Sequence, residues 1–391
     1  MDLPHNIFLY LLIVTAIAVG FMLGRRERRP RKSQAATIKD YYQGLNFLLG
    51  DRPELGVDRF IQAMEVSEES IDVHLALASV VRRRGEVDKA IRIHQNLLAS
   101  PALRAGNKQL VEFELARDFH AAGLLDRAEA LLSDIVKRRD AQEKQARDLL
   151  LDIYEQERDW QRAIEVGSKS LRIDASQKMR LSHFYCERGS EFFRAGQLKF
   201  AAENARAAVR VLSTNPRAHL LSAEIDLVQK RYKRVLRYVR RAVELQPDLA
   251  GEVLDIYAKA AQGLGQEGSY LEFLEECLQR SPDAALIEAS VDYRRGRGLQ
   301  TNVMNIVDAI KGSPRAEHLP VLLDLLELRA GDQVEMDGSV KELLEQIVVQ
   351  SRTHQCINCG FSSHAHVWHC PTCKQWGTFA NPNKAKSRVV D

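Results

Sequence analysis

Residues 75–98 read LALASVVRRRGEVDKAIRIHQNLL, and this stretch decides the fold of most of the chain. Small residues stand at Ala78 and Ala90, where two amphipathic helices have to approach each other closely, and Gly85 lies between them. Glycine accepts the positive φ of a helix C-cap, which favours a tight reversal at this point. The stretch therefore predicts a pair of antiparallel helices joined by a short turn.

The same pattern recurs along the chain, for example in ERGSEFFRAGQLKFAAENARAAVRVL at residues 187–212. The first residues of the units lie 32 to 38 residues apart, at positions 37, 71, 109, 144, 182, 216, 251 and 283. This periodicity resembles the tetratricopeptide repeat, a helix–turn–helix of about 34 residues. One helix pair cannot bury its apolar face alone, so we predict an all-α superhelix over residues 37–350, with a degenerate ninth pair at residues 315–350.

Each unit carries small residues at its helix contacts and helix-breaking residues at its ends. The small residues are Ala78, Ala90, Ala116, Ala128, Ala163, Gly189, Ala201, Ala208, Ala223, Ala242 and Ala258. The turns carry Gly85, Gly123, Gly196 and Gly265, and the unit ends carry Pro247, Pro282 and Pro314. Cys186 and Cys277 fall inside helices, so we interpret them as buried packing residues. Such an array is typical of proteins that bind peptides or helices of other proteins, with a structural spacer as the alternative.

The N-terminal segment Ile7–Leu23, IFLYLLIVTAIAVGFML, contains no charged residue. At 1.5 Å per residue it spans roughly 26 Å, which together with its uncharged flanks just crosses a hydrocarbon core of about 30 Å. No lysine or arginine precedes it, and six follow within residues 25–32. We therefore predict a single transmembrane anchor at residues 1–24, rather than a cleaved signal peptide or a buried core helix. The positive-inside rule places the basic linker at residues 25–36, and everything after it, in the cytoplasm.

The net charge of the 391-residue chain is only +3, and the basic linker more than accounts for it. A near-neutral body is not typical of nucleic-acid-binding proteins, whose affinity depends on neutralising phosphates. Residues 230–241, KRYKRVLRYVRR, are a local exception. They could bind an acidic partner, a lipid headgroup or RNA. We favour the simpler interpretation, a solvated helix face balanced by acidic neighbours.

No sequence motif points to catalysis. Residues 263–268, GLGQEG, match G-x-G-x-x-G, but a dinucleotide site needs a preceding strand, and here a turn between two helices is expected. Phosphate-binding, nucleophile-elbow and H-E-x-x-H motifs are absent from the sequence. We therefore expect no enzymatic activity.

The C-terminal segment CINCGFSSHAHVWHCPTC, residues 356–373, holds four of the six cysteines. Thiols stay reduced in the cytoplasm, and a thioredoxin-like redox pair would need a βαβ context that is missing. Two C-x-x-C turns that face each other supply four sulfurs in a tetrahedron. We predict that Cys356, Cys359, Cys370 and Cys373 bind one metal ion, iron or zinc.

The residues around the cysteines define a small knuckle domain at residues 351–380, followed by a flexible tail at residues 381–391. About thirty residues cannot fold on an apolar core alone, so metal binding would supply the folding free energy. We expect Trp368, Trp376 and Phe379 to shield the site and to dock it onto the last repeats. A histidine replacing one sulfur ligand is the lesser alternative, and the candidates are His354, His364, His366 and His369.

The turns C-x-x-C-G and C-P-x-C resemble the metal knuckles of rubredoxin and of zinc ribbons. Gly360 follows the first cysteine pair as in rubredoxin, whereas Lys374 stands where rubredoxin repeats glycine. Only ten residues separate the two pairs, far fewer than in rubredoxin. These departures favour a structural role over electron transfer.

The order of these parts resembles the lipopolysaccharide assembly protein B family of Gram-negative bacteria. The resemblance covers essentially the full chain, and the anchor and the CINCG…CPTC pair are its most specific parts. It implies a non-enzymatic, single-pass adaptor of the inner membrane that regulates lipopolysaccharide synthesis. In such a family the adaptor brings the LpxC deacetylase to the membrane protease FtsH for degradation. A membrane regulator that senses lipopolysaccharide restrains it, and other lipopolysaccharide assembly proteins and self-association are further implied contacts.

Two other functions stay open from the residues alone. One is a rubredoxin-like electron-transfer protein on a membrane-tethered scaffold, with iron in the knuckles. The other is a zinc-ribbon nucleic-acid adaptor that uses residues 230–241, although we expect no nucleic-acid binding.

Overall fold

The computed structural model describes residues 14–19, 70–101, 103–139, 141–169, 174–280, 284–298, 354–363 and 365–380. The basic linker, the first predicted repeat, most of the last two units and the tail lie outside the described residues. Of the predicted anchor only residues 14–19 are described, and they are helical. In the part of the chain that the structure describes, no helix is long and apolar enough to cross a membrane, so the anchor stays a prediction.

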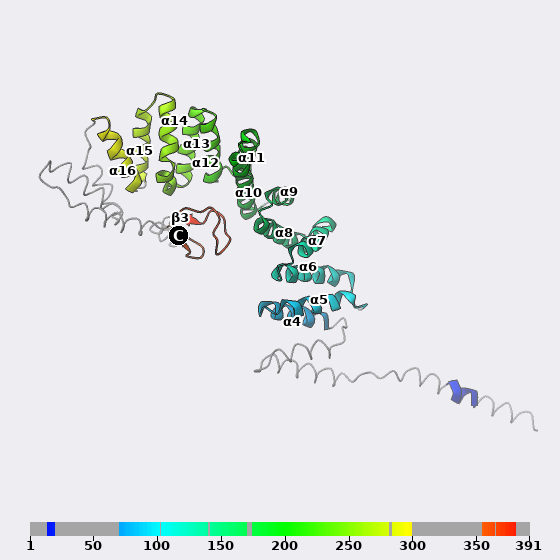
Figure 1. The fold of residues 1–391 in the computed structure, drawn as a ribbon. Helices are drawn as coiled ribbons and strands as arrows, with labels where there is room; N and C mark the ends of the chain where they lie inside the picture. The colour runs from blue at the N-terminus through cyan, green and yellow to red at the C-terminus, as the bar shows by residue number, and fades with distance from the viewer. Residues whose placement is uncertain are drawn as a thin grey trace, which may run out of the picture. The chain divides into compact units, whose positions relative to one another are not determined.

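The described body is an array of consecutive helices followed by a small three-stranded sheet (Figure 1). The helices are α4 (Ile71–Arg83), α5 (Val87–Ala99), α6 (Ala105–Ala121), α7 (Leu125–Arg138), α8 (Glu143–Glu157), α9 (Trp160–Ser168), α10 (Ala175–Arg194), α11 (Leu198–Val211), α12 (Pro216–Val228), α13 (Tyr232–Leu245), the 3-10 helix η2 (Pro247–Val253), α14 (Leu254–Gly263), α15 (Gly268–Arg280) and α16 (Ala284–Arg295). The strands are β1 (His354–Cys356), β2 (Ser362–Ser363) and β3 (Phe379–Ala380). The chain divides into two compact units, Met1–Ile153 and Tyr154–Asp391, which are described separately below.

The turn inside each described helix pair is closed by a residue with positive φ. Gly85, Gly123, Gly196 and Gly265 have φ values of 85°, 73°, 73° and 65°, which confirms the role predicted for these glycines. The following residue donates its N–H to the carbonyl five positions earlier, for example Glu86 to Val81 at 3.1 Å and Gln197 to Phe192 at 2.8 Å. This 6→1 bond satisfies a carbonyl that the helix end would otherwise leave unpaired.

Two of these turns contain no glycine. Arg158 and Lys230 take φ values of 58° and 57°, and Asp159 and Arg231 donate the same backbone bond to Tyr154 and Asp226. A left-handed conformation costs an ordinary L-residue about 1–2 kcal/mol. The reversal is therefore imposed by packing of the two helices, even where the local sequence does not favour it.

The small residues of the repeat form the contacts between helices, as predicted. Nine of the alanines named above are fully buried, with no exposed surface: Ala78, Ala90, Ala116, Ala128, Ala163, Ala201, Ala208, Ala223 and Ala242. A Cβ added to Gly189 would lie 2.9 Å from Leu221 Cδ2 and 3.3 Å from Asn204 Cβ. A larger side chain at these positions would push the helices apart, because protein interiors are close-packed.

Three further sequence interpretations are resolved by the same packing. Cys186 and Cys277 are buried, and burial raises the pKa of their thiols to about 12 and about 11, so both stay protonated. Residues 263–268 form the turn between α14 and α15, with no strand before them. Gly263 is needed there for packing, because an added Cβ would lie 2.5 Å from the Tyr232 ring.

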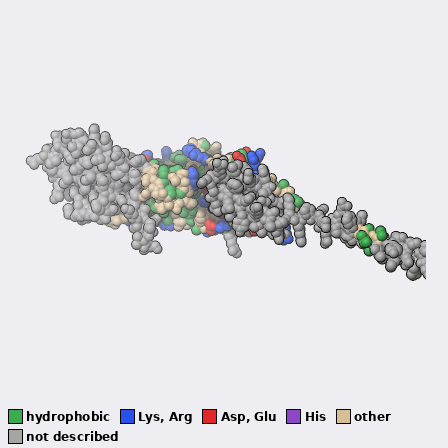
Figure 2. Space-filling view, turned by 90° about the horizontal axis from the view of Figure 1, so that it is seen from below, with side chains coloured by type: hydrophobic (Ala, Val, Ile, Leu, Met, Phe, Trp, Pro, Cys, Tyr) green, Lys and Arg blue, Asp and Glu red, His purple; other side chains and the backbone are tan. Residues whose placement is uncertain are grey.

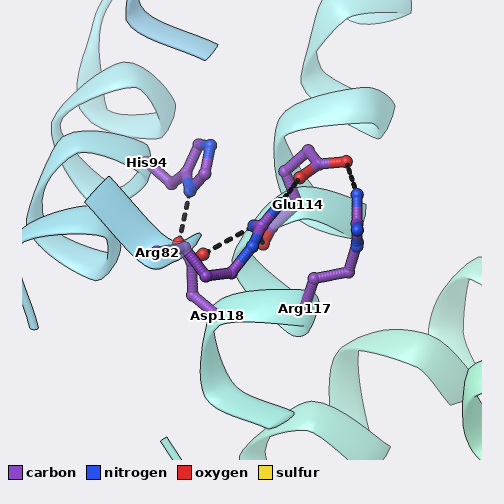
Figure 3. A network of polar contacts seen from close by, with 5 residues as sticks. All are labelled: Arg82, His94, Glu114, Arg117 and Asp118. Atoms are coloured by element: carbon purple, nitrogen blue, oxygen red, sulfur yellow. Dashed lines mark hydrogen bonds and ion pairs between the residues drawn. The ribbon is translucent and has the colours of Figure 1, made fainter. Parts of the chain in front are cut away.

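A buried network of charges joins α4, α5 and α6 in the first unit (Figure 3). Asp118 has no exposed surface, and its carboxylate oxygens lie 2.7 Å from Arg82 Nη1 and 2.5 Å from His94 Nδ1. Arg82 also donates to Glu114 at 2.7 Å, and Arg117 donates to the other Glu114 oxygen at 2.8 Å. Burial alone would raise the pKa of Glu114, but these two arginines lower it.

We expect Asp118→Ala to lower the free energy of local opening around α4–α6 by about 3 kcal/mol, since the buried Arg82 would keep only Glu114 as its partner and the buried His94 would lose the Asp118 carboxylate. Native-state hydrogen exchange of the amides in these helices measures this value. Asp134→Ala is the control, because Asp134 is exposed and its ion pair with Lys137, at 3.5 Å, lies at the surface. Its effect should stay below about 0.5 kcal/mol. Equal effects of the two substitutions would contradict the importance of the network.

Candidate metal centre

The four cysteines of the knuckle domain lie together, with their sulfurs all within 4.8 Å of one another. The Sγ atoms of Cys356 and Cys373 are 3.7 Å apart, and those of Cys359 and Cys370 are 3.6 Å apart. Metal–sulfur bonds of about 2.3 Å in a tetrahedron place sulfurs ~3.8 Å apart, whereas a disulfide would bring them to about 2.05 Å. The residues present therefore fit a single metal ion, and they are not disulfide-bonded.

The two cysteine turns are copies of one another, displaced by fourteen residues in the sequence. In the first, Gly360 N–H donates to the carbonyl of Cys356 at 2.9 Å, and in the second, Lys374 N–H donates to that of Cys370 at 3.0 Å. Cys356 and Cys370 in turn donate their N–H groups to Phe361 and Gln375, at 2.8 and 2.9 Å. This repetition makes the two pairs of sulfurs face each other from equivalent turns.

The strands of the sheet continue the repetition. Gln355 pairs with Ser362 in the antiparallel ladder β1–β2, and His369 pairs with Trp376 as an isolated bridge at the equivalent positions of the second turn. The strand β3 adds to the other edge of β1, giving the order β2-β1-β3. The sheet therefore fixes the first cysteine turn from both sides.

Lys374 stands where rubredoxin has glycine, and it adopts the left-handed backbone conformation that favours glycine. Its φ is 57°, and Gly360 in the first turn has a φ of 78°. The departure from the glycine pattern thus leaves the knuckle shape intact and adds conformational strain at one position.

Hydrogen bonds to the sulfurs favour the thiolate form that a metal ion needs. Burial alone would raise the pKa of Cys356, but the Thr378 hydroxyl, 3.2 Å from its sulfur, and the backbone amides of Cys359 and Asn358 lower it to about 6. The pKa of Cys373 is lowered, first of all by the side chain of Asn358. A backbone amide also favours the Cys359 thiolate, but neighbouring sulfurs raise its pKa to about 12. A bound cation would remove this repulsion among four thiolates and hold the two knuckles together.

The histidines of the domain do not join the sulfur cluster in the described residues, where the four cysteines are the group found. The rings of His354 and His366 lie edge-on to each other with centroids 5.5 Å apart, and His369 stacks on Trp376 at 4.3 Å. His364 lies outside the described residues. The described histidines instead contribute to a contact between the knuckle domain and the helical array.

Trp376 is the centre of that contact. Its ring stacks on His183 of α10 at a centroid distance of 4.8 Å and lies edge-on to Trp160 and Phe184, both at 6.3 Å. Its indole N–H donates to Glu155 Oε1 at 3.1 Å, and Arg180 donates to the same oxygen at 3.0 Å. Burial lowers the pKa of His183 well below its usual value, so it packs as a neutral ring.

A second contact lies at the end of α13. The Gln246 side chain donates to the Phe379 carbonyl at 3.2 Å and lies 3.3 Å from His366 Nε2. His354 Nε2 lies 3.7 Å from a carboxylate oxygen of Glu252. The described contacts thus involve the fourth to seventh predicted units. The expected docking onto the last repeats stays a prediction, because most of those repeats lie outside the described residues. Phe379 itself is buried beside Cys356 and Cys370, as predicted.

Comparison with known proteins agrees with this architecture. Residues 354–381 match a family model described as a rubredoxin metal binding domain. The chain is 29% identical over 377 residues to lipopolysaccharide assembly protein B of Escherichia coli strain K12, covering 95% of this chain and 96% of that protein. It is 28% identical over 385 residues to the protein of the same name from Haemophilus influenzae, covering 94% and 96%. These proteins match the chain over nearly its full length, as the resemblance in the sequence predicted.

Solved structures also align with this chain. The tetratricopeptide protein YrrB aligns over 48% of this chain and 97% of its own, with 16% identity and a TM-score of 0.31. The MamA protein aligns over 54% and 91%, with 13% identity and a TM-score of 0.26. At such scores the superposition is partial and does not bear on function.

Several residues of the site carry no local signal in the sequence. Thr378 and Asn358 bind the sulfurs, yet nothing in their positions relative to the cysteines marks them. Glu155 and His183 bind Trp376 from more than 190 residues away in the sequence. For this chain, only the candidate ligand set and the aromatic residues were accessible from the sequence pattern.

The strain in the second knuckle can be measured through metal affinity. Gly360→Ala should weaken binding by about 1–2 kcal/mol, because alanine must take a left-handed conformation although its Cβ meets no atom closer than 3.9 Å. Lys374→Gly should leave the affinity unchanged or raise it. Competition with a coloured zinc chelator gives both values. Strain at Lys374 would be contradicted if Lys374→Gly weakened metal binding as much as Gly360→Ala does.

Trp376→Ala should detach the knuckle domain from the array while the sulfur site stays loaded. Large-to-small substitutions of buried aromatic residues cost about 3–5 kcal/mol. Faster hydrogen exchange at the surface of α10 that faces Trp376, with unchanged metal content, is the expected result. Ile357→Ala is the matched control, since Ile357 lies in the first knuckle and is 50% exposed. Unchanged exchange in Trp376→Ala would show that this residue does not hold the two parts together.

Proposed function

We propose that the chain acts in lipopolysaccharide assembly as a membrane-tethered adaptor that carries out no chemistry itself. Sequence similarity supports the first part, because relatives that match the chain over nearly their full length are named lipopolysaccharide assembly protein B. The stack of helix pairs supports the second part, since such arrays present extended surfaces for other proteins. In finer detail, we propose that it brings the LpxC deacetylase to the membrane protease FtsH, under restraint by a membrane regulator that senses lipopolysaccharide.

The proposed mechanism is proximity. An anchor at residues 1–24 would confine the helical array to the inner membrane, on its cytoplasmic side, where the protease is also anchored. Confinement raises the effective concentration of substrate and protease without a new catalytic group. The single observation that carries this proposal is the sequence similarity to the named relatives over 95% of the chain.

The test is the half-life of LpxC in cells that carry the full chain or a variant without residues 1–24. We expect the deletion to lengthen the half-life severalfold, and an unrelated single-span helix in place of Ile7–Leu23 to restore it. Restoration separates tethering from a specific role of the anchor sequence. An unchanged LpxC half-life after deletion of residues 1–24 would contradict the proximity mechanism.

Electron transfer is a second candidate because one edge of the sulfur cluster reaches solvent. Cys359 is exposed and Cys373 is partly exposed, as a redox centre requires for contact with a partner. Metal analysis of the purified chain distinguishes the two functions. Iron with a visible band that changes reversibly on reduction supports electron transfer, and a colourless zinc protein excludes it.

A further inference from the structure

The most basic part of the array is the helix triplet α11–α13. Residues 198–245 carry eleven Lys or Arg and four Asp or Glu, a net charge of +7 in a chain whose total is +3. Part of this charge is balanced locally, since Arg240 pairs with Glu276 at 2.5 Å and Arg241 with Glu244 at 3.0 Å. On the described surface drawn in Figure 2, basic, acidic and apolar side chains lie interspersed. The unbalanced charge of this triplet is therefore a local feature.

A shallow cleft lined by α11, α12 and the start of α13 opens to solvent, and its cavity volume of about 10 Å³ has room for about one water molecule. Three guanidinium groups line it: Arg206 from α11, and Arg231 and Arg234 at the start of α13. Ser222 and Tyr238 add hydroxyl groups, and two alanines and an isoleucine add apolar surface. The lining thus combines positive charge with a small apolar surface.

Asp226 positions two of these arginines from below. It is buried, and its carboxylate oxygens lie 2.9 Å from Arg234 Nε and 3.6 Å from Arg231 Nη1. Arg234 also donates to the Tyr238 hydroxyl at 3.4 Å. One carboxylate cannot neutralise three guanidinium groups, so the cleft keeps a net positive charge with part of its donors already oriented.

Arg206 supplies the unsatisfied charge on the opposite wall. Among the residues that the structure describes, no carboxylate pairs with this exposed side chain. Arg237, on the next turn of α13, lies over the Tyr238 ring at 5.5 Å and likewise has no acidic partner in the described part. Both walls of the groove therefore offer guanidinium groups to a ligand that carries several carboxylates.

We propose that the groove between α11 and α13 binds an acidic, partly apolar segment of a partner protein. One carboxylate of the segment would lie over the mouth of the cleft between Arg206 and Arg234, and an apolar side chain would cover Ala202 of α11. This inference deepens the proposed adaptor function and rests on it. It assigns residues 230–241, for which a solvated face was the favoured interpretation, to the wall of a binding site.

A membrane surface and a nucleic acid fit the groove less well. The oriented guanidinium groups lie in a recess between helices, which a flat layer of headgroups does not enter. Binding of single strands relies on aromatic rings that are free to stack on bases. The ring of Tyr238 is instead covered by Arg234 at 5.8 Å and Arg237 at 5.5 Å.

The test uses the full chain in detergent and a fluorescent helical peptide built from Glu and Leu, with fluorescence anisotropy as the readout. The matched peptide carries Gln at every Glu position. We expect the Glu peptide to bind at least about tenfold more tightly than the Gln peptide, because charge-assisted bonds to arginine are the stronger ones. Arg206→Glu should remove this difference, and so should Arg237→Glu, whereas Lys178→Glu, an equal charge change at an exposed site on α10, should keep it.

Three outcomes would overturn the inference: equal affinity for the two peptides, an unchanged preference in Arg206→Glu and Arg237→Glu, or tighter binding to phosphatidylglycerol vesicles or to a single-stranded RNA than to the Glu peptide. The peptide assay does not depend on LpxC turnover, so the two proposals can fail separately. If Arg206→Glu abolishes the preference for the Glu peptide but LpxC turnover does not depend on this chain, the groove proposal is supported and the adaptor function is contradicted. If LpxC turnover depends on the chain but the two peptides bind with equal affinity, the adaptor function is supported and the groove proposal is contradicted.

Discussion

A left-handed backbone residue closes each described helix pair and both sulfur-bearing turns, and the rest of the structure depends on these reversals. Gly85 and Gly360 perform the same task in a helix pair and in a cysteine turn. Without the reversal, two helices cannot bring their alanines into contact, and two thiols cannot face one point. Glycine meets the requirement without strain, whereas Lys230 and Lys374 meet it because packing or sulfur geometry demands it.

The knuckle domain and the helical array support each other, although they are built on different principles. The array gains stability by repetition, since each helix pair buries its neighbour. The knuckle domain has a very small core around Cys356, Cys370 and Phe379, and it lacks enough apolar surface to fold alone. The sulfur cluster and the Trp376 contact therefore both compensate for the small apolar core of the knuckle domain. The sulfur cluster does so within the domain, and Trp376 does so by packing on the helical array.

The sequence was informative where the physical cause is local. Alanine spacing, glycine turns and the two C-x-x-C pairs predicted the helix pairs, their contacts and the sulfur set, because each depends on residues a few positions apart. The turns at Arg158 and Lys230 could not be predicted, since neither residue prefers a left-handed conformation. The docking surface at Glu155 and His183 was also inaccessible, because it is completed by residues near the other end of the chain. The anchor remains a prediction, since most of its residues lie outside the described structure.

The bond between Trp376 and Glu155 joins residues that are 221 positions apart. During synthesis at 5–20 residues per second, α8 to α10 would leave the ribosome roughly 10–40 s before their aromatic partner does. Throughout that interval Trp160, His183 and Phe184 lack their contact with Trp376. This aromatic cluster is therefore completed only when the last knuckle emerges.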